Sequence, residues 1–195
     1  MKALRLLTSE VVLGLLIAVF SVFTAWASYQ GALSDGDQSK ANLAGMKALT
    51  DGNAEYLTAN QDIIQDYTYF DTYYLNTESN PDIAEYYQAS FSDALNASMA
   101  REGGPFDEQY YSDMYDYPNT FFGEADAQFE LGEKWNERGD QLQLVMLIMA
   151  VGLSFAAWAS LLGEESKMRV IFTVLALATL VLGLVTYFNV PVVTG

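Results

Sequence analysis

Three long apolar runs separate this chain into strongly hydrophobic and polar parts. The runs cover residues 11–26, 142–162 and 170–188, with a few polar residues at their ends. Each is close to the roughly 20 residues that an α-helix needs to cross the hydrocarbon core of a bilayer. The pattern therefore predicts an all-α membrane protein with three transmembrane helices.

The same pattern predicts how the chain is divided. A long polar stretch separates the first two runs, whereas only a short turn separates the last two. The expected segments are a first transmembrane helix with a cytoplasmic N-terminus (1–29), an acidic, Tyr-rich extracytoplasmic helical domain (30–139), a second transmembrane helix (140–163), a cytoplasmic turn (164–169), a third transmembrane helix (170–190) and an outer tail (191–195).

Basic residues near the apolar runs predict the orientation. Lys2 and Arg5 precede the first run, and Lys167 and Arg169 lie in the short turn between the second and third runs. Short loops rich in Lys and Arg stay on the cytoplasmic side of a membrane. We therefore expect a protein of the cytoplasmic membrane whose polar domain is periplasmic or extracellular. In an alternative interpretation the first run is a signal peptide cleaved near Ala25 to Ala27.

The polar domain has helical periodicity and few strand signals. Residues 37–74 contain no Pro and predict an outward continuation of the first helix, with a kink at Gly31 or Gly36. Pro81 predicts the start of a second helix that extends to Arg101. We expect residues 105–120 to form an ordered aromatic loop, followed by a helix that continues into the second transmembrane helix. The domain would then be a helical bundle continuous with transmembrane helices 1 and 2.

Composition and charge exclude several functions. The chain has a net charge of −16, and residues 30–140 hold 22 acidic against five basic residues. Such a domain repels the phosphate backbone, so nucleic acid is not an expected partner. The chain has no His and no Cys, which argues against zinc, copper and haem sites. The sequence accordingly predicts no catalytic residues, no cofactor and no dedicated metal site.

Carboxylates are the only abundant reactive side chains. Pairs such as Asp62 with Asp66 occur at helical spacing, and a solvated acidic face explains them better than acid–base catalysis does. The stretch Asp35-Gly36-Asp37 begins like a calcium loop, but Met46 stands where an EF-hand has Glu. Diffuse binding of a divalent cation is left open.

Tyrosine and small residues mark two kinds of contact surface. The tyrosines form either the core of the bundle or a surface for another subunit, because Tyr suits half-buried faces. The candidate interface residues are Tyr67, Tyr69, Tyr73, Tyr74, Tyr110, Tyr111, Tyr115 and Tyr117. Small residues on one face of a helix allow helices to approach closely in lipid. The candidate helix-packing residues are Gly14, Ala18, Ser21 and Ala25 in the first helix, and Gly152, Ala156 and Ser160 in the second.

One acidic residue lies beside an apolar run. Glu10 is at the cytoplasmic edge of the first run, where Arg5 or Arg169 could neutralise it. We expect a charge pair at the membrane edge, Glu10 with Arg169, in preference to a proton path. No second ionisable group continues a route across the bilayer.

Three short motifs carry a family resemblance. They are Thr24-Ala25-Trp26-Ala27-Ser28-Tyr29-Gln30-Gly31-Ala32 at the end of the first run, Gly104-Pro105-Phe106-Asp107-Glu108-Gln109-Tyr110, and Asn136-Glu137-Arg138-Gly139-Asp140 before the second run. Together they resemble an uncharacterised prokaryotic family of three-pass membrane proteins. The resemblance implies one helix, a helical outer domain and a helical hairpin, and it implies no activity or binding residue.

Two functional hypotheses follow. The first is a non-enzymatic structural or accessory membrane subunit that assembles with itself or with a larger membrane complex. The alternative is an extracytoplasmic sensor module that binds a cation or ligand and signals through a partner. A calcium titration followed by thermal melting would distinguish them, because the absence of a shift in the melting temperature at millimolar calcium would remove the cation-binding form of the alternative.

Overall fold

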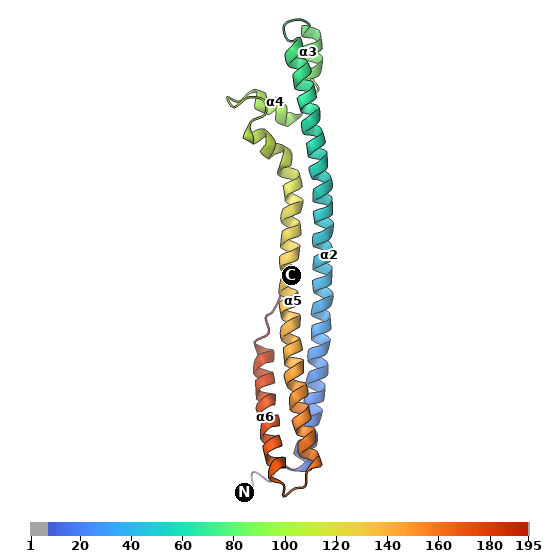
Figure 1. Ribbon diagram of the computed structural model, residues 1–195, viewed down its shortest axis with the longest axis vertical. Coiled ribbons are helices and arrows are strands. Elements are labelled where there is room, and N and C mark those ends of the chain that lie inside the picture. The colour runs from blue at the N-terminus through green and yellow to red at the C-terminus, as the bar shows by residue number, and fades with distance from the viewer. Residues whose placement is uncertain (1–7, 195) are drawn as a thin grey trace. The chain divides into compact units, whose positions relative to one another are not determined.

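The computed structural model describes residues 8–194, which are helical over most of their length (Figure 1). Its helices are α2 (Glu10–Asn76), α3 (Pro81–Gln88), α4 (Asp93–Met99), α5 (Glu108–Leu161) and α6 (Lys167–Phe188). No strand occurs within these residues. Helices α2, α5 and α6 are each long and apolar enough to cross a membrane. The all-α class with three candidate spans is therefore confirmed.

The chain forms two compact units. The first, called the spanning unit, is formed by Met1–Ala41 and Glu130–Gly195, and of it the structure describes residues 8–41 and 130–194. The second, called the polar unit, is Asn42–Phe129. Helices α2 and α5 each contribute to both units, whereas α3 and α4 belong to the polar unit and α6 to the spanning unit.

The spanning unit has a core at the contact of three helices. Its buried side chains are Leu13, Leu16, Phe20 and Ala27 of α2, Val145, Met149, Ala156 and Ala159 of α5, and Ala176 of α6. Gly152 lies where the helices come closest, because a Cβ atom there would overlap the Phe20 ring and the Thr179 hydroxyl. Trp26 also donates a 2.8 Å hydrogen bond to the Tyr187 hydroxyl, which joins α2 to α6.

The polar unit packs its part of α2 against α5 through glycines and phenylalanines. A Cβ atom on Gly45 would lie 2.8 Å from the ring of Phe129. One on Gly52 would lie 3.0 Å from the ring of Phe122. Beyond these contacts, Ile63, Phe91, Leu95 and Tyr110 form a second buried cluster. Gly45 and Gly52 of α2 thus give the aromatic rings of α5 room to pack.

The expected helix from Pro81 to Arg101 is in fact two helices. Helix α3 ends at Gln88, and α4 begins at Asp93 after a four-residue break. Ser92 caps α4, since its hydroxyl accepts a 3.1 Å hydrogen bond from the backbone N–H of Leu95. A serine that caps a helix competes with continuation of the helix before it, which accounts for the break.

The expected aromatic loop at residues 105–120 is also wrong for most of its length. Helix α5 begins at Glu108 and includes Pro118. Asp107 accepts a 2.8 Å hydrogen bond from the backbone N–H of Tyr110 and so fixes the start of the helix. Gly31 and Gly36, where a kink is expected, both lie within α2, which is helical from Glu10 to Asn76.

Candidate functional site

The two predicted small-residue faces have different environments in the spanning unit. Gly152 and Ala156 of α5 are buried against the neighbouring helices of the same chain. Ser160 is exposed, and its hydroxyl donates to the Ala157 carbonyl. Every predicted residue of the α2 face is exposed, namely Gly14, Ala18, Ser21 and Ala25. The α5 face is therefore used mostly within the chain, and the α2 face is left open.

Arg169 lies at the junction of three helices and does not contact Glu10. Its side chain is 2% exposed. Its Nε donates a 2.9 Å hydrogen bond to the Thr8 carbonyl, and its Nη1 donates a 2.8 Å bond to the Leu162 carbonyl. No ion pair within the described residues includes Glu10, which is exposed.

The expected Glu10–Arg169 pair is therefore corrected to a clamp between Arg169 and backbone carbonyls. The Leu162 carbonyl follows directly on the end of α5, where carbonyls lack partners within the helix. A cation near a helix C-terminus is also favoured by the helix dipole. Arg5, the other expected partner of Glu10, and Lys2 lie outside the described residues.

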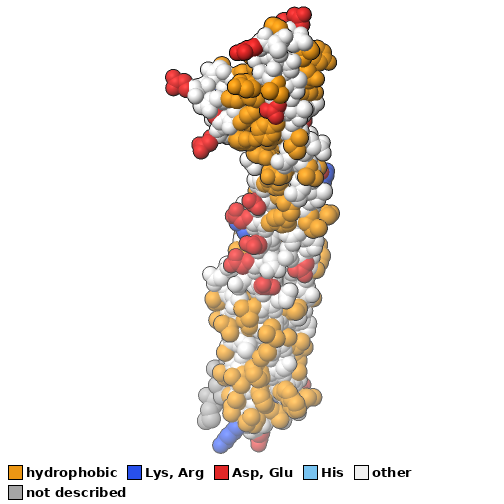
Figure 2. Space-filling model, turned by 45° about the horizontal axis from the view of Figure 1, so that its top comes forward, with side chains coloured by type: hydrophobic (Ala, Val, Ile, Leu, Met, Phe, Trp, Pro, Cys, Tyr) orange, Lys and Arg blue, Asp and Glu red, His pale blue; other side chains and the backbone are white. Residues whose placement is uncertain are grey.

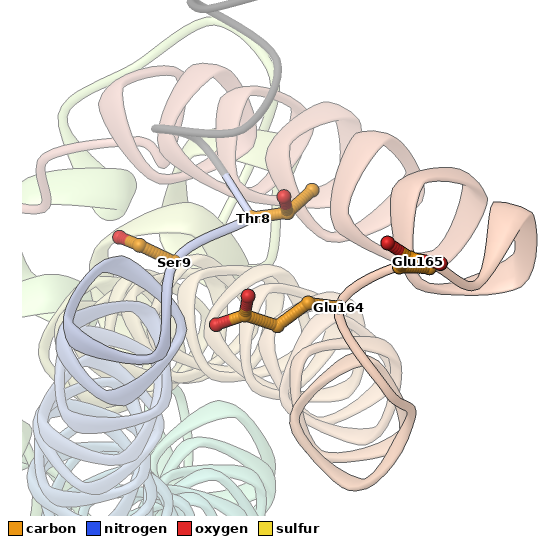
Figure 3. A pocket seen from close by; sticks show the side chains of 4 residues that line it. All are labelled: Thr8, Ser9, Glu164 and Glu165. Carbon is orange, nitrogen blue, oxygen red and sulfur yellow. The ribbon is translucent and has the colours of Figure 1, made fainter.

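A pocket of about 390 Å³ opens beside this clamp (Figure 3). Thr8 and Ser9 line it from the segment that enters α2, and Glu164 and Glu165 line it from the turn between α5 and α6. The carboxylate of Glu164 points toward the Thr8–Ser9 segment (Figure 3). Two of the described residues that line this pocket, Glu164 and Glu165, are acidic.

The polar unit contains a buried carboxylate that binds three donors. Asp66 of α2 is 2% exposed. Its Oδ1 accepts a 3.0 Å hydrogen bond from the backbone N–H of Ser92, and its Oδ2 accepts from the Ser92 hydroxyl at 2.5 Å. The hydroxyl of the fully buried Tyr110 donates to the same Oδ2 at 2.9 Å. This network joins α2, the cap of α4 and the first turn of α5.

A second polar contact closes the loop between α4 and α5. Arg101 donates to both oxygens of Asp107, through Nε at 2.6 Å and Nη2 at 2.7 Å. This bidentate bond, together with the backbone N–H of Tyr110, lowers the pKa of Asp107 to about 2. The same bond raises the pKa of Arg101. Gly104 allows the turn between them, because its φ of +89° is rarely adopted by other residues.

The predicted tyrosine surface is only partly a surface. Tyr110 is fully buried, and Tyr69, Tyr73, Tyr111 and Tyr115 are half-buried around the cluster that contains it. Tyr74 and Tyr117 are 69% and 60% exposed, and Tyr67 is 38% exposed. Five of the eight candidate interface tyrosines thus contribute to the interior of the polar unit, and three can contact another molecule directly.

Hydrogen bonding among these rings changes their acidity. The hydroxyls of Tyr67 and Tyr111 are hydrogen-bonded to each other, and this bond, with partial burial, raises the pKa of Tyr67 to about 12. Burial and the nearby Asp66 carboxylate raise the pKa of Tyr110 further. These phenols therefore stay protonated at neutral pH.

The acidic stretch that resembles the start of a calcium loop is helical. Asp35, Gly36 and Asp37 lie within α2, and Asp37 forms a 2.7 Å ion pair with Lys40 one turn along. A calcium loop wraps its ligands around the ion, which a continuous helix does not do. No group of three or more acidic, His or Cys side chains in residues 8–194 is arranged to hold a metal ion.

Sequence reasoning missed the polar contacts that organise the two units. Helical spacing pairs Asp66 only with Asp62 on an acidic helix face, whereas its hydrogen-bonding partners lie 26 and 44 residues away. Comparisons with protein-family models, with curated proteins and with solved structures find no match to this chain. The resemblance to three-pass membrane proteins therefore stays a prediction.

Proposed function

We propose that this protein is a non-enzymatic accessory subunit of the cytoplasmic membrane that assembles with copies of itself or with a larger membrane complex. In this proposal, α2, α5 and α6 cross the bilayer, and the polar unit lies outside the cytoplasm. The observation that carries the proposal is the open small-residue face of α2.

The open face contrasts with the rest of the spanning unit. Helix α2 already packs on α5 and α6 through large side chains such as Leu13, Leu16 and Phe20. Its exposed Gly14, Ala18, Ser21 and Ala25 lie on another face, and a Cβ atom at Gly14 would meet no neighbour within 4 Å. Helices in lipid associate through such small-residue faces, because the backbones can approach closely. The face thus fits a further membrane helix.

The surface of the polar unit supports the same role. Large apolar side chains such as Leu57, Ile64 and Tyr86 are more than half exposed. In Figure 2, hydrophobic and acidic side chains are intermingled on the visible face of this unit. Mixed aromatic and polar surfaces are typical of specific contacts between subunits.

Substitutions on α2 test the assembly. In the double variant Gly14→Leu with Ala18→Leu, two bulky side chains occupy the small-residue face. A matched control, Leu15→Phe with Val22→Phe, enlarges two other exposed side chains of the same helix. We expect the first variant to reduce the mass of the native particle to that of a single chain, while the control keeps the wild-type mass.

The measurement is native mass spectrometry, or sizing of the particle after extraction in native nanodiscs. A wild-type protein that is already a partner-free monomer in nanodiscs would contradict the proposal. The proposal would also fail if both double variants kept the wild-type mass, because the contact would then lie elsewhere.

A further inference from the structure

The part of α2 that belongs to the polar unit has an exposed apolar face. Large side chains on this face are between 59% and 69% exposed, namely Leu43, Met46, Leu57 and Ile64. The residues two positions further along are all buried, namely Gly45, Ala48, Ala59 and Asp66. An α-helix turns about 100° per residue, so two positions rotate the side chain by about 200°. The exposed apolar face therefore lies opposite the face of α2 that is buried inside the unit.

This exposed face is uncharged along its whole length. Positions at spacings of three and four residues form what we call the outer stripe: Leu43, Met46, Thr50, Ala54, Leu57, Gln61, Ile64 and Thr68. All of them are exposed. The stripe is about 38 Å long, because each helical residue adds about 1.5 Å. The acidic residues in the same stretch of α2 are off the stripe, namely Asp51, Glu55, Asp62 and Asp66.

The absence of charge on the stripe selects the kind of occupant. Residues 42–129 hold 16 acidic residues and only Lys47 and Arg101 as basic ones. Two copies of such a unit repel each other wherever acidic side chains meet, and a symmetric contact brings the same surface of both copies together. A basic partner would instead gain from acidic residues in the contact. An uncharged stripe on so acidic a unit therefore favours a second copy over a basic partner.

The polar side chains of the stripe are compatible with burial against a copy of themselves. The hydroxyl of Thr50 donates a 2.8 Å hydrogen bond to the Met46 carbonyl, and that of Thr68 donates a 2.9 Å bond to the Ile64 carbonyl. Burial of these hydroxyls therefore leaves no unpaired donor. The amide of Gln61 has both donors and an acceptor, so two copies of it can bond to each other across a two-fold axis.

We propose that the outer stripe is a contact between two copies of this chain, with their α2 helices parallel. The inference rests on the proposed function, in which all copies cross the same membrane in the same direction. Helix α2 is one helix from Glu10 to Asn76, so its direction in the polar unit is then also the same in every copy. A parallel two-fold contact packs each stripe position close to the same position of the other copy.

Single cysteines in the full chain test this contact in native membranes. Leu57→Cys and Ile64→Cys place thiols on the stripe, where facing positions of packed helices are within reach of a disulfide. The controls Thr58→Cys and Gln65→Cys place exposed thiols one position further along, about 100° around the helix. After mild oxidation with copper phenanthroline, we expect at least fivefold more covalent dimer in the stripe variants than in the controls. Equal fractions, or no dimer in the stripe variants, would overturn the proposal.

Complementary charges test whether the stripe faces its own copy. In the Ile64→Cys chain, Leu57→Asp and Leu57→Lys are added separately, and the two chains are co-expressed with tags of different mass. Like charges would face each other when one variant pairs with itself, whereas opposite charges would face each other in the mixed pair. We expect the mixed covalent dimer to form at least threefold more than either like pair. The matched controls Thr58→Asp and Thr58→Lys should show less than a twofold preference, and equal dimer formation in all Leu57 pairs would overturn the proposal.

The masses of the products separate this inference from the proposed function. A covalent product of twice the chain mass supports the stripe contact, whereas a product of another mass would identify a different polypeptide on the stripe and overturn the inference. The native particle mass of the unmodified protein reports assembly independently. A particle of several chains without dimer from Leu57→Cys or Ile64→Cys would overturn the stripe contact alone. A partner-free particle of one chain would overturn both the contact and the proposed function.

Discussion

At the scale of single residues, two buried charged side chains organise the two units. Arg169 binds backbone carbonyls at the ends of the helices in the spanning unit. Asp66 accepts hydrogen bonds from two other segments in the polar unit. The hydrogen bonds of each side chain offset part of the cost of burying its charge, so these residues also restrict which segments can pack together.

Removal of the Asp66 carboxylate should weaken the attachment of α4 to α2. In Asp66→Ala the N–H of Ser92 and the hydroxyl of Tyr110 lose their acceptor, and such losses cost about 1–3 kcal/mol each when the groups stay buried. We expect hydrogen exchange of the α4 amides to accelerate more than tenfold. The exposed Asp71→Ala is the control and should leave the exchange near the wild-type rate. Unchanged protection in Asp66→Ala would contradict the assigned network.

The Arg101–Asp107 contact predicts a loss of stability in acid. The pKa of Asp107 is lowered to about 2 in the folded protein, below the roughly 3.9 of an unperturbed Asp. The unfolded state therefore binds more protons, and stability falls as the pH decreases from about 4 to about 2. The urea midpoint of the polar unit should decrease over this range in the wild type. The urea midpoint should decrease less over this range in Asp107→Asn. Glu108→Gln is the control, and its urea midpoint should decrease as much as that of the wild type.

At the scale of the helices, periodicity predicted the long apolar segments well and the short polar ones poorly. Each apolar run lies within one of the helices α2, α5 and α6, because about 20 apolar residues in succession are a helix signal that composition and length alone supply. The break before α4 depends on the Ser92 cap, and the early start of α5 depends on Asp107. Aromatic residues near a Pro suggested a loop, but packing of Tyr110 in the core favours a helix there.

The candidate contact surfaces could be predicted only in part from the sequence. Spacing showed that Gly14, Ala18, Ser21 and Ala25 share a face, but it could not show whether the chain itself covers that face. The same limit applied to Tyr110, which is equally compatible with a core and with an interface until its neighbours are known. Contacts such as Asp66 with Ser92 join distant positions and have no local sequence signal.

Glycine substitutions test the helix contacts in the spanning unit. Gly152→Ala places a Cβ atom against Phe20 and Thr179, so we expect a lower thermal midpoint, with a cost of about 1–3 kcal/mol for overpacking. Gly36→Ala is a matched control, since its Cβ atom would meet nothing within 4 Å. That control should be neutral or gain up to about 1 kcal/mol from helix propensity. A Gly152→Ala protein as stable as Gly36→Ala would contradict the close packing.

At the scale of the whole molecule, we propose that three helices cross the membrane and that the acidic unit lies outside the cytoplasm. The three apolar helices are a property of the structure. The sidedness is our prediction, and it follows from Lys167 and Arg169 in the turn between the last two helices. Contacts of the polar unit depend on this arrangement, because it decides which partners the polar unit can meet.

The most direct test of this arrangement is labelling of single cysteines in intact cells. The natural chain has no Cys, so each introduced thiol is the only target. Ser79→Cys places an exposed thiol in the polar unit, and Glu164→Cys places one in the turn between α5 and α6. We predict that a membrane-impermeant maleimide labels Ser79→Cys in intact cells and labels Glu164→Cys only after permeabilisation. The reverse pattern, or equal labelling of both positions in intact cells, would contradict the account.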